Sequence, residues 1–287
     1  MDLRPLGTTG LLVSPIGLGT VKLGRNRGIK YPGGEGYTLP SDEQIVELFT
    51  AAADLGVNLI DTAPAYGTSE ERIGTVMHAN DWFGGRDRWV VCTKAGEEFD
   101  NDTGESRYDF SPRAIRASVE RSLRRLRTDH LDVVLIHSDG RDEWIIRESG
   151  VLEVLSELTR LGAIRAFGMS TKTVDGGLMA IRRAEGVGGA CDVVMVEYSP
   201  MHRTEGYVID AAAHRGVGVL IKKALGSGHL KDLWQKTPAD LRGNTEDPIE
   251  AALRFVFLRR GVSSVVLGTA NVSHLTVNVR AAERAGA

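Results

Sequence analysis

Short apolar runs recur from one end of the chain to the other, and polar helical patterns separate them. Most of the runs, such as Trp89-Val-Val-Cys, contain no polar residue. Strands that are buried on both faces of a parallel sheet have this continuous pattern, whereas half-exposed strands alternate. We therefore predict eight strands, which begin at Ile16, Val57, Trp89, Val133, Ile164, Val193, Val217 and Ser264.

Amphipathic segments follow these strands, and several carry signals for helix ends. Ser41 and Gln44 have the spacing of a capping box, Ser111 precedes a proline at the first helical position, and Asp247 with Glu250 predicts a second capping box. The predicted helices start at these three caps and between Gly150 and Gly162, and shorter ones cover 69–78, 174–185, 205–214 and 273–283.

Eight strand–helix units in one chain predict a (β/α)8 barrel, which we expect to form one domain over residues 1–287. An open doubly wound sheet is the alternative, but Gly17 and Gly19 lack the third glycine of a dinucleotide fingerprint and no GxxxxGK[ST] motif occurs. Residues 4–14 predict a β-hairpin that caps one barrel end. We expect long loops at 24–40 and 226–246, on the face that follows the strands.

Composition excludes several classes of protein. The chain has 42% hydrophobic and 25% charged residues, and 35 Lys+Arg against 38 Asp+Glu give a formal net charge of -3, which does not favour a nucleic-acid partner. No apolar stretch reaches the roughly 18 residues of a membrane helix, and no signal peptide is evident, so we expect a cytoplasmic protein. Cys92 and Cys191 lie in apolar runs and are predicted to be buried free thiols. The scattered histidines predict no metal site.

Polar groups stand where the predicted strands end. Asp61, Lys94 and His137 end the second, third and fourth strands, and later strands lead into Ser170, Glu197, Lys222 and Thr269. The carboxyl ends of parallel barrel strands surround one cavity, so these side chains should converge there. A buried ion pair that plugs the barrel is the structural alternative, and for Glu197 that interpretation stays open.

Tyr66, on the loop after Asp61, completes a chemical group with Lys94 and His137. A free tyrosine is a poor acid, because its pKa is about 10. A nearby ammonium lowers that pKa, a carboxylate keeps the ammonium charged, and a histidine orients a substrate oxygen. Such a group donates a proton to a carbonyl oxygen without a nucleophile or metal. It requires an electron source, which would be a bound cofactor.

These residues resemble the aldo-keto reductase family. The matching motifs run along most of the chain: residues 4–20, Asp61-Thr-Ala-Pro-Ala-Tyr-Gly, Thr93-Lys-Ala-Gly, Leu135-Ile-His-Ser, Gly168-Met-Ser, Val196-Glu-Tyr-Ser-Pro and Gly268-Thr-Ala-Asn. The resemblance implies a (β/α)8 barrel that reduces aldehydes and ketones with a nicotinamide dinucleotide. It also implies that Asp61, Tyr66, Lys94 and His137 are the catalytic tetrad, with Tyr66 as the general acid.

The resemblance further implies a cofactor site, with NADP preferred and NAD possible, and a small-molecule carbonyl substrate. Several positions depart from the family pattern: Thr171 replaces an Asn, Met195 a Gln, Lys222 a ring-stacking aromatic residue, and Gly268 and His274 a Lys and an Arg. The implied cofactor-binding residues are Gly19, Thr20, Asp61, Ser170, Thr171, Lys222, Lys223, Leu225, Ser227, Gly268, Thr269, His274 and Asn278.

Two other functions stay open from the sequence. Lys94 at a strand end is also where a Schiff-base aldolase could carry its lysine, although Asp61 would keep that amine charged. Alternatively, the altered residues beside the nicotinamide position could belong to a cofactor-binding sensor or partner module with little turnover. The oligomeric state is not predicted.

Overall fold

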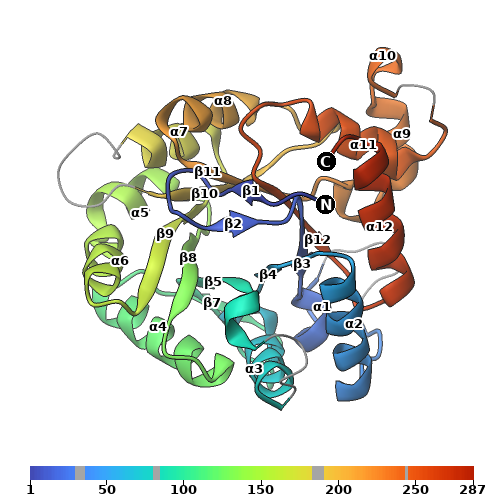
Figure 1. Cartoon of the computed structure of the whole chain (residues 1–287). Coiled ribbons are helices and arrows are strands. Elements are labelled where there is room, and N and C mark those ends of the chain that lie inside the picture. Colours follow the sequence, from blue (N-terminus) through green and yellow to red (C-terminus); the bar gives the residue numbers. More distant parts are fainter. Residues whose placement is uncertain (30–35, 80–84, 183–190, 243–244) are drawn as a thin grey trace.

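The computed structural model describes residues 1–29, 36–79, 85–182, 191–242 and 245–287. Eight parallel strands close into a barrel within these residues, in the order β10-β11-β12-β3-β4-β5-β8-β9 (Figure 1). The predicted (β/α)8 barrel is confirmed. Its strands are β3 (Ile16–Gly19), β4 (Leu59–Asp61), β5 (Val90–Ala95), β8 (Leu131–His137), β9 (Ile164–Ser170), β10 (Val193–Glu197), β11 (Gly218–Lys222) and β12 (Ser264–Gly268).

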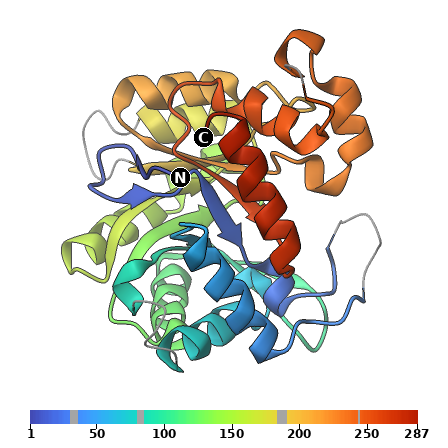
Figure 2. The same ribbon diagram turned by 45° about the vertical axis from the view of Figure 1, so that its right-hand side comes forward.

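Helices surround the strands on the outside of the barrel (Figures 1 and 2). All the predicted helices are present, and most of their ends agree with the prediction within a residue or two. Residues 183–185 of the predicted helix 174–185 lie outside the described residues. Their bounds are α2 (Asp42–Asp54), α3 (Ser69–Ala79), α4 (Pro112–Leu126), α6 (Val151–Arg160), α7 (Val174–Arg182), α8 (Gly206–Arg215), α11 (Pro248–Phe257) and α12 (Val272–Arg284).

The predicted N-terminal hairpin is also confirmed, and it lies across the centre of the barrel in Figure 1. It consists of β1 (Arg4–Pro5) and β2 (Leu12–Val13), which pair antiparallel. Leu6, Leu11 and Val13 are at most 4% exposed and pack against the apolar side chains inside the barrel. The hairpin therefore covers apolar surface that an open barrel end would expose to water.

Two apolar layers hold the fold together, one inside the barrel and one between strands and helices. Successive strand residues point to opposite faces. In β8, for example, Val133 and Leu135 pack inside the barrel, whereas Val134 and Ile136 pack against the helices. Both faces of the strands are buried over most of their length, which explains the continuous apolar runs of the sequence.

Of the two capping boxes predicted from the sequence, one is confirmed and the other is wrong. Ser41 and Gln44 form the predicted capping box, since each side chain accepts a hydrogen bond from the other residue's backbone. Asp247 caps α11 by accepting from the backbone N–H of Ile249, 2.9 Å away. The second capping box is wrong, because the Glu250 carboxylate binds Arg254 and Arg284 instead.

The structure adds elements that the sequence pattern did not predict. The expected loop 226–246 is partly wrong, because it contains η5 (Gly226–Gly228), α9 (Leu230–Lys236) and α10 (Ala239–Arg242). This segment contains one fully buried apolar side chain, Leu233. Its helices are too short to give a recognisable helical period in the sequence. The other additions are α1 (Val21–Gly24), α5 (Asp142–Glu148), β6 (Glu97–Phe99) and β7 (Ser106–Tyr108), with 3-10 turns at η1 (Pro64–Tyr66) and η3 (Arg86–Arg88).

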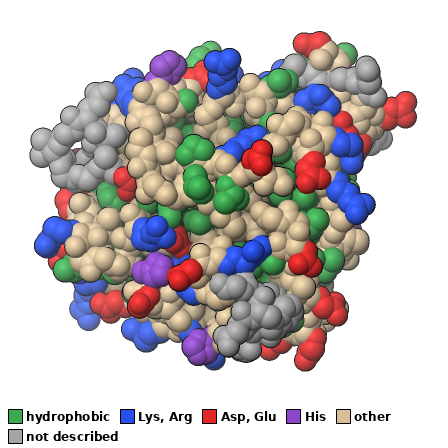
Figure 3. Space-filling view, in the orientation of Figure 1, with side chains coloured by type: hydrophobic (Ala, Val, Ile, Leu, Met, Phe, Trp, Pro, Cys, Tyr) green, Lys and Arg blue, Asp and Glu red, His purple; other side chains and the backbone are tan. Residues whose placement is uncertain are grey.

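Among the described residues, no helix is long and apolar enough to cross a bilayer. On the face shown in Figure 3, acidic and basic side chains are interspersed, and apolar side chains reach the surface near the centre, over the hairpin. Cys92 and Cys191 are buried thiols that form no disulfide, as predicted. The single-domain division and the cytoplasmic location stay predictions.

Candidate active site

The alternation of strand residues explains why polar groups converge at one end of the barrel. Leu59, Cys92 and Leu135 face the barrel interior. The next residue on the same face lies two positions later, which gives Asp61, Lys94 and His137. The same rule extends to the other strands and places Gly19, Ser170, Glu197, Lys222 and Gly268 on the inner face. We call this end, where the strands finish, the barrel mouth.

Lys94 and Asp61 form a buried ion pair at the mouth. The Lys94 ammonium lies 2.7 Å from Asp61 Oδ1, and the two side chains are 1% and 4% exposed. The ammonium also donates to the backbone oxygen of Thr62 at 2.9 Å. Burial alone would lower the pKa of Lys94, but the charges of Asp61 and Tyr66 outweigh burial and raise that pKa above its usual value. Lys94 is therefore cationic, which contradicts the requirement of a Schiff-base aldolase for a neutral amine.

Tyr66 lies beside this ion pair, on the 3-10 turn η1. The Lys94 ammonium is 4.9 Å from the centre of the Tyr66 ring, within the range of a cation–π contact. The Tyr66 and His137 rings meet edge to face, with their centres 6.3 Å apart. The structure thus brings together Asp61, Tyr66, Lys94 and His137, as the sequence predicted.

His137 has a partner that the sequence analysis missed. Its Nδ1 lies 2.8 Å from Oε2 of Glu97, although the contact misses the alignment of a regular hydrogen bond. Burial lowers the pKa of the His137 imidazole, while Glu97 acts in the opposite direction. Burial would raise the pKa of Glu97, but His137, Ser106 and Tyr108 together lower it to about 2. Near neutral pH the pair is therefore a carboxylate beside a neutral imidazole.

Lys222 and Ser170 form a second contact at the mouth, among the residues expected to bind the cofactor. The Lys222 ammonium donates to Ser170 Oγ at 2.9 Å and to the backbone oxygen of Thr171 at 2.8 Å. Burial and the positive charges of Lys223 and Lys94 lower the pKa of Lys222 to about 8. Thr171 Oγ1 is buried and has no hydrogen-bond partner among the described residues.

The contact between Lys223 and Glu197 decides whether Glu197 plugs the barrel, which the sequence left open. The Lys223 ammonium lies 2.6 Å from Glu197 Oε2, and the two side chains are 53% and 28% exposed. Lys223 has a left-handed backbone, with φ of 57°, which is uncommon for a residue other than glycine. The pair therefore lies at the edge of the mouth, and Glu197 does not plug the barrel.

Gly19 ends β3 and Thr20 follows it directly, as expected from the sequence. The Thr20 hydroxyl already makes its hydrogen bonds within the protein. The Thr20 hydroxyl donates to the backbone oxygen of Asp61 at 2.9 Å and accepts from Ser69 Oγ at 2.9 Å. Thr20 is fully buried. Its side chain therefore joins β3 to β4 and α3, while Gly19 has its backbone beside Gly268.

The remaining residues that are expected to bind the cofactor lie in two places. Leu225 and Ser227 belong to the turn before α9, where Ser227 is left-handed with φ of 54°. Thr269 and the exposed His274 flank the start of α12, and Asn278 is 8% exposed farther along that helix. The Thr269 hydroxyl is engaged with the backbone of Asn271. The helix N-terminus is also occupied, because Asn271 Oδ1 accepts from the His274 backbone N–H.

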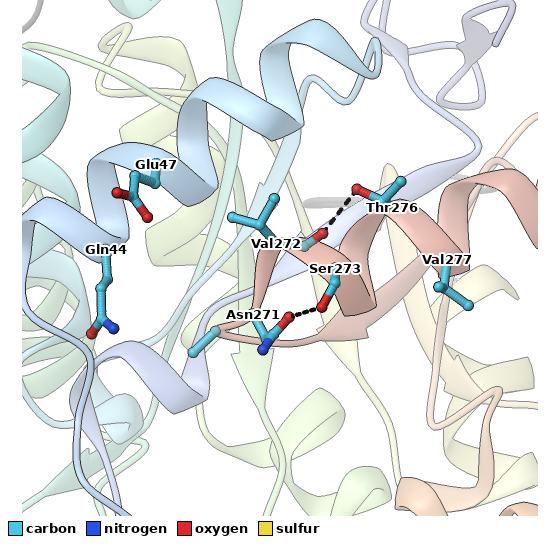
Figure 4. A pocket seen from close by; sticks show the side chains of 8 residues that line it. Gln44, Glu47, Asn271, Val272, Ser273, Thr276 and Val277 are labelled. Carbon is cyan, nitrogen blue, oxygen red and sulfur yellow. Dashed lines mark hydrogen bonds between the residues drawn. The ribbon is translucent and has the colours of Figure 1, made fainter.

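A groove of 620 Å³ lies beside the start of α12, outside the mouth. Figure 4 shows Gln44 and Glu47 on α2 across from Val272 and Ser273 on α12. None of the tetrad residues lines this groove. Because no tetrad residue lines this groove, we place the chemistry at the barrel mouth and not here.

Asp142 is a further site residue that sequence reasoning missed. Its side chain is 2% exposed and accepts from Ser138 Oγ and from the backbone N–H groups of Lys172 and Thr173. These contacts hold together the loops that follow β8 and β9, which carry His137 and Ser170. Asp142 gave no signal in the sequence, because it lies in a segment without a regular helical period.

Comparison with known proteins identifies the family. A model of the aldo/keto reductase family matches residues 15–285. This chain belongs to the aldo-keto reductase family. As a member, it is an NAD(P)-dependent oxidoreductase whose substrate is a small carbonyl compound. Nothing in the comparisons supports the sensor alternative.

Individual relatives of the chain support its membership of the aldo-keto reductase family. The chain is 27% identical to an L-galactose dehydrogenase of Arabidopsis thaliana, over 98% of this chain and 88% of the relative. It is 30% identical to an NADH-specific methylglyoxal reductase of Escherichia coli, over 79% of this chain and 68% of the relative. A solved structure of a Pseudomonas aeruginosa protein assigned to the family is 44% identical, with a TM-score of 0.82 and coverage of 99% and 95%.

Proposed function

We propose that this aldo-keto reductase reduces an aldehyde or ketone to an alcohol, with Tyr66 as the general acid and NADPH as the preferred reductant. The observation that carries the proposal is the buried Lys94–Asp61 pair beside the Tyr66 ring. A fixed positive charge next to a phenol favours the phenolate, so it makes the hydroxyl a better proton donor. The substrate oxygen receives that proton, and Tyr66 recovers one from solvent.

Each member of the tetrad has a separate task in this proposal. Asp61 holds the Lys94 ammonium charged and in place, with a 2.7 Å contact. Lys94 stabilises the charge left on Tyr66 after proton transfer. His137 lies edge to face with Tyr66 and orients the oxygen that is protonated. Only Tyr66 and His137 contact the substrate oxygen in this proposal, whereas Asp61 and Lys94 act through Tyr66, and none of the four acts as a nucleophile.

The residues at the mouth fit a nicotinamide dinucleotide. Thr171 Oγ1 is buried without a partner among the described residues, so it retains hydrogen-bonding capacity for a ligand. Ser170 and Lys222 lie next to it, and we propose that these three residues hold the nicotinamide end. Leu225 and Ser227 would cover the pyrophosphate. When bound, the reduced cofactor supplies the hydride that the carbonyl carbon accepts.

We propose a small preference for NADPH over NADH. His274 stands where an arginine would bind the 2′-phosphate, Gly268 contributes no charge, and Asn271 occupies part of the helix N-terminus. Hydrogen bonds from Thr269 or Asn278 would each contribute about 0.5–1.5 kcal/mol. One such bond corresponds to at most about a tenfold preference. The Escherichia coli relative described as NADH-specific keeps NADH as the alternative.

The test is a panel of aldehydes and ketones assayed with NADPH and NADH, with cofactor binding followed by fluorescence. We expect Tyr66→Phe to bind cofactor as the wild type does and to lose roughly 10²–10⁴-fold in kcat. Tyr207→Phe is the matched control, because Tyr207 is 72% exposed on α8 and should not affect turnover. Wild-type kcat in Tyr66→Phe would remove Tyr66 as the acid. Tighter binding of NADH than of NADPH at both pH 6 and pH 8 would refute the cofactor preference.

A further inference from the structure

Lys222 brings a positive charge to the barrel mouth, and no carboxylate of the described residues pairs with it. Two residues earlier on β11, Leu220 faces the barrel interior, so the Lys222 side chain also points inward. The ammonium groups of Lys94 and Lys223 have carboxylate partners at 2.7 and 2.6 Å. The Lys222 ammonium instead contacts two uncharged oxygens at the end of β9, at 2.9 and 2.8 Å.

This charge is present near neutral pH, although its surroundings oppose it. Burial and the positive charges of Lys223 and Lys94 lower the pKa of Lys222 to about 8, so most molecules still carry the ammonium at pH 7. The charged and titratable groups around it are Lys223 beside it, Glu197 on β10, Lys94 on β5, His137 on β8 and Asp142 on α5. A partly buried cation without a paired carboxylate acts on any charge that binds next to it.

The proposed function places the nicotinamide end of the cofactor against Lys222. Ser170 and Thr171 lie next to the ammonium, and the buried Thr171 Oγ1 has no partner among the described residues. The two redox forms of the cofactor differ only at this end, because the reduced ring is neutral and the oxidised ring carries a positive charge. The pyrophosphate and the adenosine are the same in both forms. A cation at this position therefore distinguishes the two forms.

We propose that Lys222 is a specificity-determining residue that makes the enzyme bind the reduced cofactor more tightly than the oxidised cofactor. Its ammonium repels the cationic ring of the oxidised form and has no such effect on the neutral ring of the reduced form. An aromatic side chain at this position would attract a cationic ring through a cation–π contact, so the lysine has the opposite effect. The inference rests on the proposed function and extends it to the redox state of the cofactor.

This selectivity affects the end of each turnover. Carbonyl reduction leaves oxidised cofactor at the mouth, and the Lys222 ammonium weakens its binding there. The oxidised form should therefore leave readily and inhibit the enzyme only weakly. The overall equilibrium between carbonyl and alcohol is unchanged, because an enzyme does not alter the free energies of the unbound reactants and products.

The direct test is the Kd of each redox form, measured by isothermal titration calorimetry at pH 7 without a carbonyl substrate. Two like unit charges about 10 Å apart weaken binding roughly 15-fold at an effective dielectric constant of about 20. We therefore expect Lys222→Met to lower the ratio of the Kd for NADP⁺ to the Kd for NADPH by about tenfold or more. NAD⁺ and NADH should show the same change, because the ring charge does not depend on the 2′-phosphate.

Two further variants separate the charge of Lys222 from other effects. Lys172→Met is the matched control, because it also removes one positive charge close to Ser170, but from an exposed side chain. Water and salt screen an exposed charge, so this variant should leave the ratio within about twofold of the wild type. Lys222→Arg keeps a positive charge that does not titrate below pH 10, so it should keep the wild-type ratio at every pH tested.

The pH dependence of the same ratio gives a second readout. In the wild type the ratio should fall between pH 7 and pH 9, because Lys222 loses its proton with a pKa of about 8. Near pH 8, NADP⁺ should release more protons on binding than NADPH does, as calorimetry in two buffers of different ionisation enthalpy detects. Both effects should vanish in Lys222→Met. Titration of His274 or of the 2′-phosphate affects both forms alike and cancels in the ratio.

The outcomes separate this inference from the proposed function. Equal binding of both forms by the wild type, or a ratio unchanged in Lys222→Met, would overturn the role of Lys222 even if the enzyme reduces carbonyls. A pH dependence that persists in Lys222→Met would belong to another group, such as Tyr66, and would also refute the inference. Absence of carbonyl turnover would overturn the proposed function, and the binding ratio could still change as predicted.

Discussion

Replacement of Lys94 by methionine tests whether the ion pair at the mouth is as deeply buried as the structure indicates. Methionine has a similar length and fills the same apolar surroundings, so the change removes the charge and little else. Asp61, which is 4% exposed, then loses the ammonium that lies 2.7 Å from its Oδ1. The variant therefore leaves a carboxylate that is removed from water and without its cation.

The distance between the two charges sets the size of the loss of stability expected for Lys94→Met. Two unit charges 2.7 Å apart attract each other by about 6 kcal/mol at an effective dielectric constant of about 20. The ammonium no longer has to be desolvated in the variant, which offsets part of that loss. We expect a net decrease of about 3–5 kcal/mol in the free energy of unfolding, as for other buried pairs that lose one partner.

The assay is urea unfolding at neutral pH of Lys94→Met, Asp61→Asn and the double variant. The double variant has no unpaired charge, so we expect it to be more stable than Lys94→Met alone. Lys223→Met is the matched control: its ion pair with Glu197 is equally short, but its side chain is 53% exposed, so the loss should stay below about 1 kcal/mol.

The pH dependence follows from the direction of the Lys94 pKa. Because the folded-state pKa lies above the unfolded value, the contribution of the pair is fully present below about pH 10 and is lost only as the pH rises above it. The decrease in the free energy of unfolding that Lys94→Met causes should therefore be the same at pH 6 and pH 8. A loss below about 1 kcal/mol, or a double variant no more stable than Lys94→Met, would refute the reasoning.

Two further predictions concern stability. Gly168→Ala should cost about 3 kcal/mol or more, because its Cβ would lie 1.7 Å from the backbone oxygen of Val193 on the neighbouring strand, and a wild-type urea midpoint would contradict that packing. The pKa of Lys222 is lowered to about 8, so the unfolded chain binds more protons than the folded one between pH 8 and pH 10. Across that window the wild type should gain about 1.4 kcal/mol per pH unit relative to Lys222→Met, and a constant difference would show that Lys222 is not buried as described.

The sequence by itself determined the barrel and most of the tetrad, because both depend on local rules. Continuous apolar runs indicated strands buried on both faces, and Ser41 with Gln44 marked a helix start that the structure has. Asp61, Lys94 and His137 were recognisable because an inward-facing polar residue after an apolar run must lie at the barrel mouth. The hairpin cap followed from its turn residues.

Contacts between distant residues decided the rest. Glu250 was predicted to complete a helix cap, but Arg284, 34 positions later, takes its carboxylate at 2.7 Å. Lys222 and Lys223 are adjacent lysines in the sequence, yet one side chain is directed to Ser170 inside the mouth and the other pairs with Glu197 at its edge. Their backbones differ, since Lys223 adopts a left-handed conformation.

Glu97 shows the limit of the sequence most clearly. In the chain it is the first of two glutamates after a glycine, and nothing local distinguishes it from Glu98. Only the pairing of β6 with β7 directs Glu97 toward His137 and Glu98 toward Arg121. Strand alternation makes the two faces different, but which face meets the histidine depends on where the hairpin docks, and tertiary packing alone fixes that position.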